Sequence, residues 1–360
     1  MPNRIRVAVV GIGNRGSWAL DAFQRTGQFE VAALVDPIGA RVDYARKTKN
    51  LPAAAGYADL TTCLTRTPLD AVAVFTPDGM HAEPVEAALR AGKWVFVEKP
   101  LEITNARLDR IIEADRQAGG KTFVGFNLRF APVYATMKRL LDEGVTGEIL
   151  TVQADEFYDG GRTYFRRWNR LRSVGGGLWV TKSCHDFDLL HWLVGADPTG
   201  VYASCALRHY RPKPEATMYC RDCRLKADCP DRHDLHPLPC TPMDELTEQA
   251  TGQRADLCLY NSDKDTFDHG QACVRFANGA MATYTVSVVA GFTNRRIRVA
   301  GTKAALDADM EAGTVVIRRR DPSGEERLTP GSGLGHGGAD EFVMGAFAAF
   351  IRGKPVPHMV

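Results

Sequence analysis

A lysine stands at the end of a stretch that the sequence predicts to be a buried strand. Residues 94–97 are apolar and run directly into Glu98, Lys99 and Pro100. Charged groups at the mouth of a buried strand cost desolvation free energy unless binding or chemistry uses them. An ammonium group there can stabilise the negative charge that develops on an alcohol oxygen as its carbon loses a hydride. Lys99 is therefore a candidate catalytic residue.

The segment TKSCHDFD, residues 181–188, supplies a second set of candidates. Helical spacing predicts Thr181, His185 and Asp188 on one face of a helix, with Lys182 on its flank. A histidine can accept the hydroxyl proton near neutral pH, because its ordinary pKa lies there. Lys182 would add a second positive charge. We therefore expect Lys99, His185, Lys182 and Thr181 to form the catalytic group.

A glycine turn near the start of the chain predicts a dinucleotide site. Gly11, Gly13 and Gly16 follow the apolar run 5–10 in G-x-G-x-x-G spacing. The first glycine permits the tight turn, the second admits a pyrophosphate, and the third lets the next helix pack closely. Asp36 ends the second apolar strand, where a carboxylate binds ribose hydroxyls and repels a 2′-phosphate. The sequence thus favours NAD over NADP, and the alternative is a plain strand–helix turn.

The elements that position these residues alternate between strand and helix. Apolar strands at 69–77, 93–97 and 121–127 alternate with helices at 81–91 and 104–118, which predicts an open, doubly wound parallel sheet. Ligands bind such sheets at the carboxyl ends of the strands. The expected cofactor contacts are Gly11, Gly13, Asn14, Arg15, Gly16, Asp36, Thr76, Pro77, His81, Glu98, Lys99 and Asn127.

Several longer segments resemble one known family. AVVGIGNRG (8–16), the stretch 70–104 with its EKP, VGFNLRFAPVY (124–134), 175–195 and 295–307 are similar to the Gfo/Idh/MocA family of nicotinamide-dependent oxidoreductases. The resemblance covers nearly the whole chain. It implies a Rossmann domain at 1–126 and, at 127–360, an α/β domain with a large open, mostly antiparallel sheet. The outer face of that sheet commonly forms oligomer contacts, so a homodimer or homotetramer is expected.

The resemblance also assigns roles within the site. Lys99 and His185 match the catalytic lysine and histidine of the family, and a sugar, cyclitol or polyol hydroxyl is implied to meet nicotinamide between the domains. The family pattern has an aspartate four residues before the histidine, where this chain has Thr181. His185 therefore lacks its usual charged orienting partner. The expected substrate contacts are Arg129, Tyr164, Arg167, Trp168, Asp188 and His336, with His269 as a further possibility.

A cysteine-rich insertion at 211–258 is expected to need a ligand that stabilises it. It is rich in proline and charge, and Cys220, Cys223 and Cys229 stand in C-x2-C-x5-C spacing. Four thiolates form a closed structural zinc site, for which Cys258 or Cys240 is the fourth ligand. His233 and His236 are outside candidates. An iron–sulfur cluster and unliganded thiols are the alternatives to zinc.

Composition limits the remaining possibilities. The chain has 360 residues, 44% hydrophobic residues and a net charge of +2, so nothing general favours nucleic acid or an anionic membrane. No apolar stretch approaches the length of a membrane span, and the sequence enters a strand at once, which predicts a cytoplasmic protein without a signal peptide. The family usually continues past the last helix, so a C-terminal tail is expected to be missing.

Three functions fit these observations. The first is an NAD-dependent dehydrogenase of a sugar, cyclitol or sugar derivative. The second is an NAD-dependent glycoside-cleaving enzyme, which oxidises a ring hydroxyl transiently, eliminates, and reduces the product again. The third is a nucleotide-sensing protein without catalysis, which would leave Lys99 and His185 without a purpose.

Overall fold

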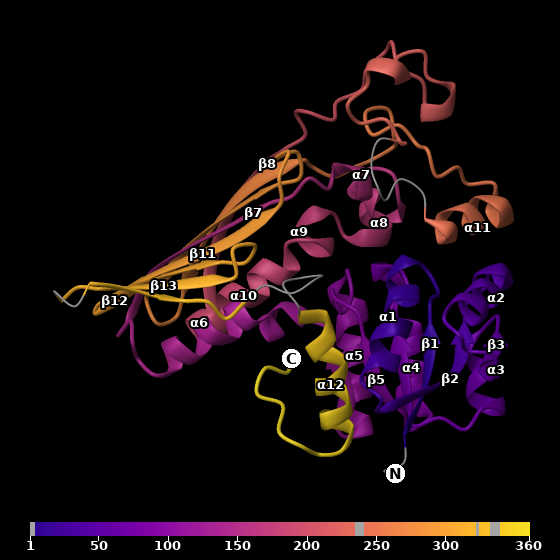
Figure 1. Ribbon diagram of the computed structural model, residues 1–360, viewed down its shortest axis with the longest axis horizontal. Helices are drawn as coiled ribbons and strands as arrows, with labels where there is room; N and C mark the ends of the chain where they lie inside the picture. The colour runs from indigo at the N-terminus through magenta and orange to yellow at the C-terminus, as the bar shows by residue number, and fades with distance from the viewer. Residues whose placement is uncertain (1–3, 235–240, 322–323, 332–338) are drawn as a thin grey trace.

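A parallel six-stranded sheet forms the first part of the molecule (Figure 1). The computed structural model describes residues 4–234, 241–321, 324–331 and 339–360. The strand order is β3-β2-β1-β4-β5-β6, the arrangement of a dinucleotide-binding Rossmann sheet. The strands are β1 (Ile5–Val10), β2 (Phe29–Val35), β3 (Ala55–Tyr57), β4 (Ala71–Val74), β5 (Trp94–Val97) and β6 (Thr122–Val124).

Helices cover both faces of this sheet, which explains its continuous apolar strands. They are α1 (Asn14–Arg25), α2 (Gly39–Thr48), α3 (Leu60–Arg66), the 3-10 turn η1 (Asp78–Met80), α4 (Ala82–Arg90) and α5 (Asn105–Ala118). The strand predicted at 121–127 is shorter than expected. It ends at Val124, and Asn127 already begins the 3-10 turn η2 (Asn127–Phe130), because the chain turns there toward the second sheet.

A second sheet of eight strands follows, in the order β14-β13-β12-β11-β7-β10-β9-β8. Adjacent strands in this sheet are antiparallel, except that β7 and β10 run parallel to each other. The strands are β7 (Ile149–Phe157), β8 (Pro198–Ala206), β9 (His269–Phe276), β10 (Met281–Ser287), β11 (Asn294–Gly301), β12 (Ala304–Asp309), β13 (Thr314–Arg319) and β14 (Glu325–Leu328). The predicted fold class, a Rossmann sheet followed by a large, mostly antiparallel sheet, is confirmed.

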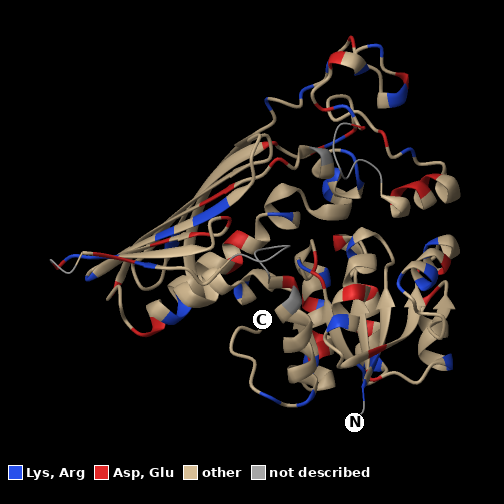
Figure 2. Ribbon diagram, in the orientation of Figure 1, with Lys and Arg blue, Asp and Glu red and all other residues tan. Residues whose placement is uncertain are grey.

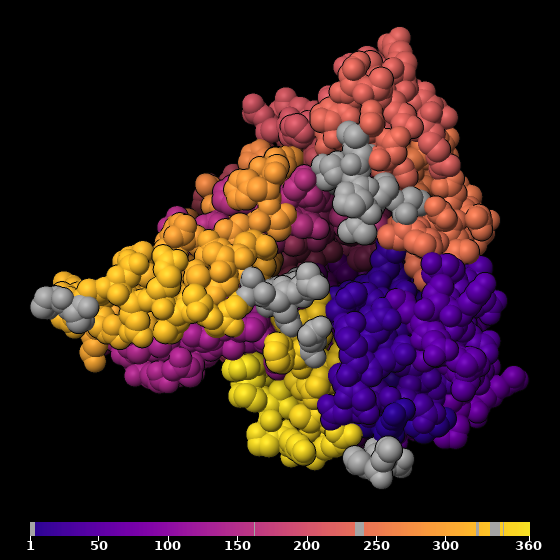
Figure 3. Space-filling view, in the orientation of Figure 1, coloured from indigo at the N-terminus to yellow at the C-terminus, as the bar shows by residue number. Residues whose placement is uncertain are grey.

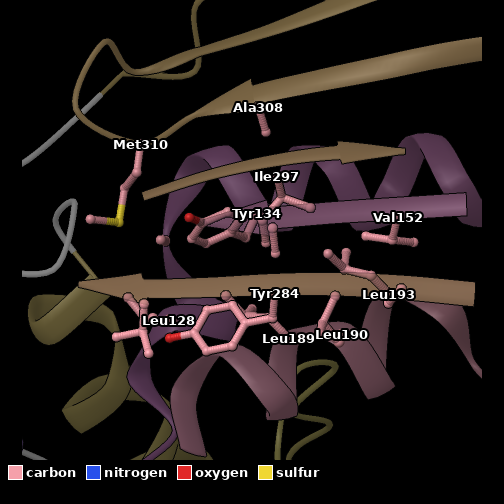
Figure 4. Close-up of a cluster of buried hydrophobic side chains, with 14 of the residues drawn as sticks. Leu128, Tyr134, Val152, Leu189, Leu190, Leu193, Tyr284, Ile297, Ala308 and Met310 are labelled. Carbon is pink, nitrogen blue, oxygen red and sulfur yellow. The ribbon is translucent and has the colours of Figure 1, made fainter. Parts of the chain in front are cut away.

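One face of the second sheet is packed and the other is bare. Exposed and buried residues alternate along β9, as expected for a sheet covered on one side. Helices α6 (Pro132–Asp142) and α10 (Cys184–Val194) cover the packed face, where side chains such as Tyr134 and Leu190 meet Tyr284 and Ile297 (Figure 4).

Short elements lie between the two sheets and lead into the insertion. They are α7 (Gly161–Tyr164), η3 (Trp168–Arg170), α8 (Arg172–Gly175) and α9 (Leu178–Thr181). The insertion carries η4 (Cys220–Asp222), η5 (Lys226–Asp228) and α11 (Pro242–Thr251). Figure 1 shows α11 beside α1 and α2, and Met243 of α11 packs into the core of the first sheet.

The last helix, α12 (Ala339–Ile351), returns to the first sheet. Val343, Met344 and Phe347 belong to the core of that sheet. By packing, α12 is therefore part of the first unit, although the sequence boundary at 126 placed it in the second. Figure 2 shows Lys and Arg interspersed with Asp and Glu over both sheets in this view. Within the described part of the chain, every helix is too short or too polar to cross a bilayer.

Candidate active site

The glycine turn has the tight geometry that its spacing predicts. Gly11 has φ +87°, and a Cβ there would lie 2.7 Å from the backbone of Phe75. A Cβ on Gly16 would lie 1.9 Å from the Gly11 carbonyl oxygen, so α1 packs directly on the turn. A Cβ on Gly13 would meet no described atom within 4 Å. The turn is therefore closed toward the protein and open at Gly13, as an approaching phosphate requires.

Asp36 is fixed at the end of β2 beside this turn. The backbone N–H groups of Ile12 and Ile38 each donate to its carboxylate at 2.8 Å. Arg41 of α2 lies 3.4 Å from the same carboxylate and also bonds Thr247 of α11. Sequence reasoning missed Arg41, although its place in the first turn after β2 was visible. An arginine beside the ribose carboxylate bears directly on the choice between NAD and NADP.

Two of the predicted cofactor contacts, Arg15 and Asn127, also link α12 to the first sheet through Asp340. Arg15 pairs with Glu98 at 2.6 Å and with Asp340 at 2.8 Å. Asn127 also donates to Asp340. Asp340 was missed because nothing in its local sequence links it to residues more than two hundred positions earlier.

Asn14, another predicted cofactor contact, lies at the junction between the glycine turn and the insertion. Its side chain bonds Thr241 and lies 3.4 Å from Asp244. Thr241 caps α11, and Asp244 completes that capping box. The start of α11 therefore rests on the start of α1.

His81 braces the turns that follow β4 and β5. The side chain is fully buried, with Nδ1 2.9 Å from the Pro100 carbonyl oxygen and Nε2 3.0 Å from that of Thr76. Burial lowers the pKa of His81 below its ordinary value. Thr76 in turn donates to the Met80 carbonyl oxygen at 3.0 Å, and Pro77 precedes η1. His81, predicted as a cofactor contact, thus positions Thr76 and the EKP turn.

Lys99 joins the two units of the molecule. Its Nζ donates to the carbonyl oxygen of Thr181 at 2.8 Å. Thr181 is buried, and its side chain hydrogen-bonds to Asp78 of η1. Burial raises the pKa of Asp78 to about 7, although the charge of Lys99 opposes the rise. Burial also raises the pKa of the Cys184 thiol to about 12, and Lys99 and Asp78 both act on it electrostatically.

The predicted single helix over 181–188 is broken. α9 ends at Thr181 and α10 begins at Cys184, with Lys182 between them. Lys182 Nζ lies 2.6 Å from Glu156 of β7 and 4.1 Å from the centre of the Tyr158 ring. Burial lowers the pKa of Lys182. Its ammonium is therefore paired with Glu156 of the second sheet.

His185 lies in the first turn of α10. It is buried, and its ring stands edge-on to Phe126, with centroids 6.2 Å apart. The next residue, Asp186, bonds Arg295 at 2.6 Å and receives the Tyr284 hydroxyl at 2.8 Å. These contacts fix the start of α10 on the second sheet. They thereby fix the position of the His185 backbone, which precedes Asp186 in the same turn.

The predicted substrate contacts divide into two groups. Arg129 and Asp188 form a bidentate pair at 2.6 and 2.8 Å, and Arg129 also lies over Trp192. The guanidinium of Arg129 and the carboxylate of Asp188 thus bind each other. Tyr164 is buried in the core of the second sheet, and burial raises its pKa.

The remaining candidates lie toward the insertion. Arg167 pairs with Asp244 at 3.0 Å, and Trp168 is partly exposed at the start of η3. His269 is 2.7 Å from Asp268. Figure 3 shows a recess bounded by the insertion, the second sheet and the first unit. His336 lies outside the described residues.

Four of the predicted metal ligands line one cavity. Cys220, Cys223, Cys229 and Cys258 all border a space of about 230 Å³. Among the described residues, however, no three His, Cys, Asp or Glu side chains are close enough to bind one metal ion. The predicted single zinc ion is therefore not matched by the described positions of these thiols. Cys240, the alternative ligand, lies outside the described residues.

Family models match most of the chain. A model of the oxidoreductase family with an NAD-binding Rossmann fold matches residues 5–126, and a model of the GFO/IDH/MocA C-terminal domain matches residues 134–307. These matches confirm the resemblance found in the sequence.

Individual proteins agree with the family models. YteT, a putative oxidoreductase of Bacillus subtilis (strain 168), is 31% identical over 257 residues, 67% of this chain and 60% of that protein. An inositol 2-dehydrogenase/D-chiro-inositol 3-dehydrogenase of Lactiplantibacillus plantarum is 30% identical over 210 residues, 58% of this chain and 56% of that protein. The chain thus aligns with 56–60% of the length of these relatives.

A solved structure shows the same fold. The oxidoreductase domain protein from Kribbella flavida matches with a TM-score of 0.77 over 99% of this chain and 92% of its own, at 22% identity.

Proposed function

Because the chain belongs to the GFO/IDH/MocA family of oxidoreductases, we propose that it oxidises a secondary hydroxyl of a sugar, cyclitol or related polyol with NAD. The observation that carries this proposal is the position of Lys99. It leaves the end of β5 and donates to Thr181 of the second unit at 2.8 Å. A cationic donor is thereby held at the carboxyl edge of the cofactor sheet, where ligands of such sheets bind.

The residues of the first unit fit NAD. The glycine turn is open only at Gly13, and no side chain caps the start of α1 among the described residues, so its N–H groups are left for a pyrophosphate. The carboxylate of Asp36 suits ribose hydroxyls. NAD supplies the hydride acceptor when bound.

Lys99 is assigned the alcohol oxygen of the substrate. An ammonium has three hydrogens, and the hydrogen bond to Thr181 uses one of them. The others can bind the hydroxyl oxygen and stabilise its negative charge as the carbon–hydrogen bond breaks. Thr181 and His81 act as positioning residues, since one fixes the ammonium and the other braces the turn that carries it.

His185 is assigned the hydroxyl proton, and Asp78 compensates for the aspartate that the family pattern has four residues earlier. The carboxyl of Asp78 reaches the same Thr181 from η1 rather than from the histidine helix. With its pKa raised to about 7, it carries a partial negative charge near neutral pH. Its charge then opposes that of Lys99 and tunes how strongly the ammonium binds the substrate oxygen.

A substrate screen tests the proposal. The protein is incubated with NAD and a panel of cyclitols, free sugars, anhydrosugars and glycosides, and each mixture is followed by NADH absorbance and product chromatography. We expect stoichiometric NADH and a ketone product with at least one cyclitol or sugar. Cleavage of a glycoside without net NADH would instead assign the redox-assisted elimination, and no turnover with any member would remove the substrate class.

A further inference from the structure

The insertion gathers four thiols that the proposed reaction does not use. Cys220 and Cys258 are buried, Cys223 and Cys229 are partly buried, and all four line one cavity of about 230 Å³. In the printed sequence these residues lie up to 38 positions apart, so the fold itself brings them together.

Two backbone segments carry these cysteines. Tyr219 and Leu257 form an antiparallel bridge, in which the Cys220 N–H donates to the Asp256 carbonyl oxygen and the Cys258 N–H to that of Met218. Cys220 and Cys258 therefore lie on adjacent segments, diagonally across the bridge. The two tight turns η4 and η5 then return the chain, so that Cys223 and Cys229 border the same cavity. Each turn ends at one of these cysteines.

The lobe of residues 211–234 is held mainly by polar contacts, such as those of Arg221 with Asp256 and of Asn261 with the Lys213 carbonyl oxygen. Among residues 211–234, only Cys220 and Asp231 are buried. A segment that buries so little apolar surface cannot offset the conformational entropy of ordering its backbone. A ligand bound by the cysteines would therefore add to the stability of these turns.

The size of the cavity distinguishes between ligands. A zinc ion is held by thiolates at about 2.3 Å, which draws four sulfurs tightly around one point. The described cysteines are not grouped closely enough for one ion, and the cavity that they line together with other residues has a volume of about 230 Å³. We propose that Cys220, Cys223, Cys229 and Cys258 ligate an iron–sulfur cluster, in which each thiolate binds a different iron atom.

The surroundings suit an anionic cluster. Arg166, Lys213 and Lys226 line the cavity, and Arg166 is buried and fixed by hydrogen bonds to the Leu257 and Asp231 carbonyl oxygens. The backbone N–H of His233 donates to Cys220 Sγ at 3.2 Å. Hydrogen bonds of this kind stabilise cluster thiolates.

Carboxylates also border the cavity. They are Glu215, Asp228 and Asp231. The side chain of Asp231 already accepts hydrogen bonds from the hydroxyls of Tyr210 and Tyr260, at 3.2 and 2.5 Å. Both carboxylate oxygens of Asp231 are therefore already engaged by hydroxyl donors.

The cluster would act on the structure of the insertion rather than on hydride transfer. Through α11 the same insertion contacts the glycine turn at Asn14 and pairs with Arg167. A cluster that orders the lobe thus also fixes α11 over the first unit. The role assigned here is structural, and no electron transfer is required of it.

Metal analysis of the full chain tests the proposal. The protein is purified without oxygen, and iron, acid-labile sulfide and zinc per chain are measured, before and after reconstitution with iron and sulfide. We expect about four irons and about four sulfides, with visible charge-transfer absorption. Zinc without sulfide, or no iron even after reconstitution, would overturn the proposal.

Two variants test the ligands. Cys223→Ser removes a partly buried thiol of the cavity and should lower the bound iron and sulfide several-fold. Cys205→Ser changes an exposed cysteine of β8 and should leave them unchanged. Equal iron content in the two variants would contradict the ligand assignment. If Cys223→Ser folds poorly, the iron and sulfide content of the unmodified chain still tests the proposal.

Discussion

The ammonium of Lys99 and the carboxyl of Asp78 meet at Thr181, although they come from different turns of the first unit. One group donates to the Thr181 backbone and the other bonds its side chain. The position of the ammonium therefore depends on residues that the sequence separates by about a hundred positions. This arrangement leads to two predictions at the level of single residues.

Replacing Lys99 with alanine should lower turnover far more than it weakens NAD binding. An electrostatic stabiliser of this kind contributes on the order of a hundredfold or more to kcat. Lys93→Ala is a matched control, because Lys93 lies at the other end of β5 and bonds only the Leu69 carbonyl oxygen in the described contacts. Steady-state kinetics and NAD titration give the comparison, and Lys99→Ala activity within about threefold of the unmodified protein would contradict the assignment.

Asp78→Asn should change how stability depends on pH. Burial raises the pKa of Asp78 to about 7, so the folded state binds its proton more tightly than the unfolded chain does. The stabilisation from this group is complete below the ordinary carboxyl pKa and is lost as pH rises toward 7. From pH 4 to pH 8 the unmodified protein should therefore lose on the order of 1–3 kcal/mol relative to the variant.

Urea unfolding of both proteins across this pH range measures the effect. The kinetic profile supplies an independent readout, because the variant should lose a titration near pH 7 from kcat/KM. Parallel stability curves for the two proteins would show that Asp78 ionises normally.

The sequence identified Lys99, His185 and Asp36 because each follows a recognisable strand or helix signal. Asp78, Arg41 and Asp340 were missed, since their roles arise from burial and from contacts between distant segments. The ion pairs of Arg15 with Glu98 and Asp340 were missed for the same reason. Sequence spacing predicts which element carries a side chain, but not which charged residue from another segment it contacts.

At the level of elements, β2 and α2 together set the choice of cofactor. Asp36 is held by two backbone N–H groups, and Arg41 is drawn onto it. The unmodified protein should prefer NAD, because the carboxylate repels a 2′-phosphate. Asp36→Ser should shift the kcat/KM ratio toward NADP by roughly tenfold or more, about 1.4 kcal/mol, since it also frees Arg41.

Arg41→Ala is the control for that experiment. Combined with Asp36→Ser, it should remove the gained NADP activity. A preference of the unmodified protein for NADP would refute the role of the carboxylate.

The start of α10 is fixed by a buried charge network on the second sheet. Arg295 lies between Glu156 and Asp186 at 2.6 Å from each, and Lys182 pairs with the same Glu156. The charges of Arg295 and Lys182 hold the pKa of Glu156 below its usual value, against the effect of burial. The network, rather than a continuous helix, orients the residues around His185.

Arg295→Met should destabilise the protein strongly. It leaves two buried carboxylates with one remaining cation, and breaking a buried pair typically costs about 3–5 kcal/mol. Arg298→Met is the matched control on the same strand, because Arg298 is more than a third exposed and contacts Gln153 and Asp307 at the surface. The free energy of urea unfolding distinguishes the two, and equal losses would show that the network is not responsible.

The break between α9 and α10 shows why the sequence predicted the wrong element there. Residues 181–188 have helical spacing, and local propensity does not separate Thr181 from Cys184. Lys182 leaves helical geometry where its ammonium reaches Glu156. That contact exists only once β7 is in place, so local patterning could not indicate it.

Over the whole molecule, the two units are joined by contacts that a linear boundary does not describe. α12 packs into the first core from the end of the chain, and Arg15 binds its Asp340. The insertion adds α11 beside α1 and α2. The strand and helix alternation predicted the first sheet well, because each strand is buried on both faces. The returning helix could not be assigned, since its apolar face fits either core.

The uncovered face of the second sheet has exposed apolar side chains that could form a contact between subunits. Tyr202 of β8 is 73% exposed and Met281 of β10 is 54% exposed. The register places Tyr202 beside Cys273 and Thr283, which are also exposed, so an apolar and polar surface continues across three strands. Exposed apolar surface on a sheet favours association, and we expect a homodimer or homotetramer formed through this face. Light scattering should show the oligomer in the unmodified protein and smaller species in Tyr202→Lys. Ile112→Lys, at a 54% exposed position of α5, is the control and should not change the mass. A monomeric unmodified protein at micromolar concentration, or equal masses for the two variants, would place the contact elsewhere or remove it.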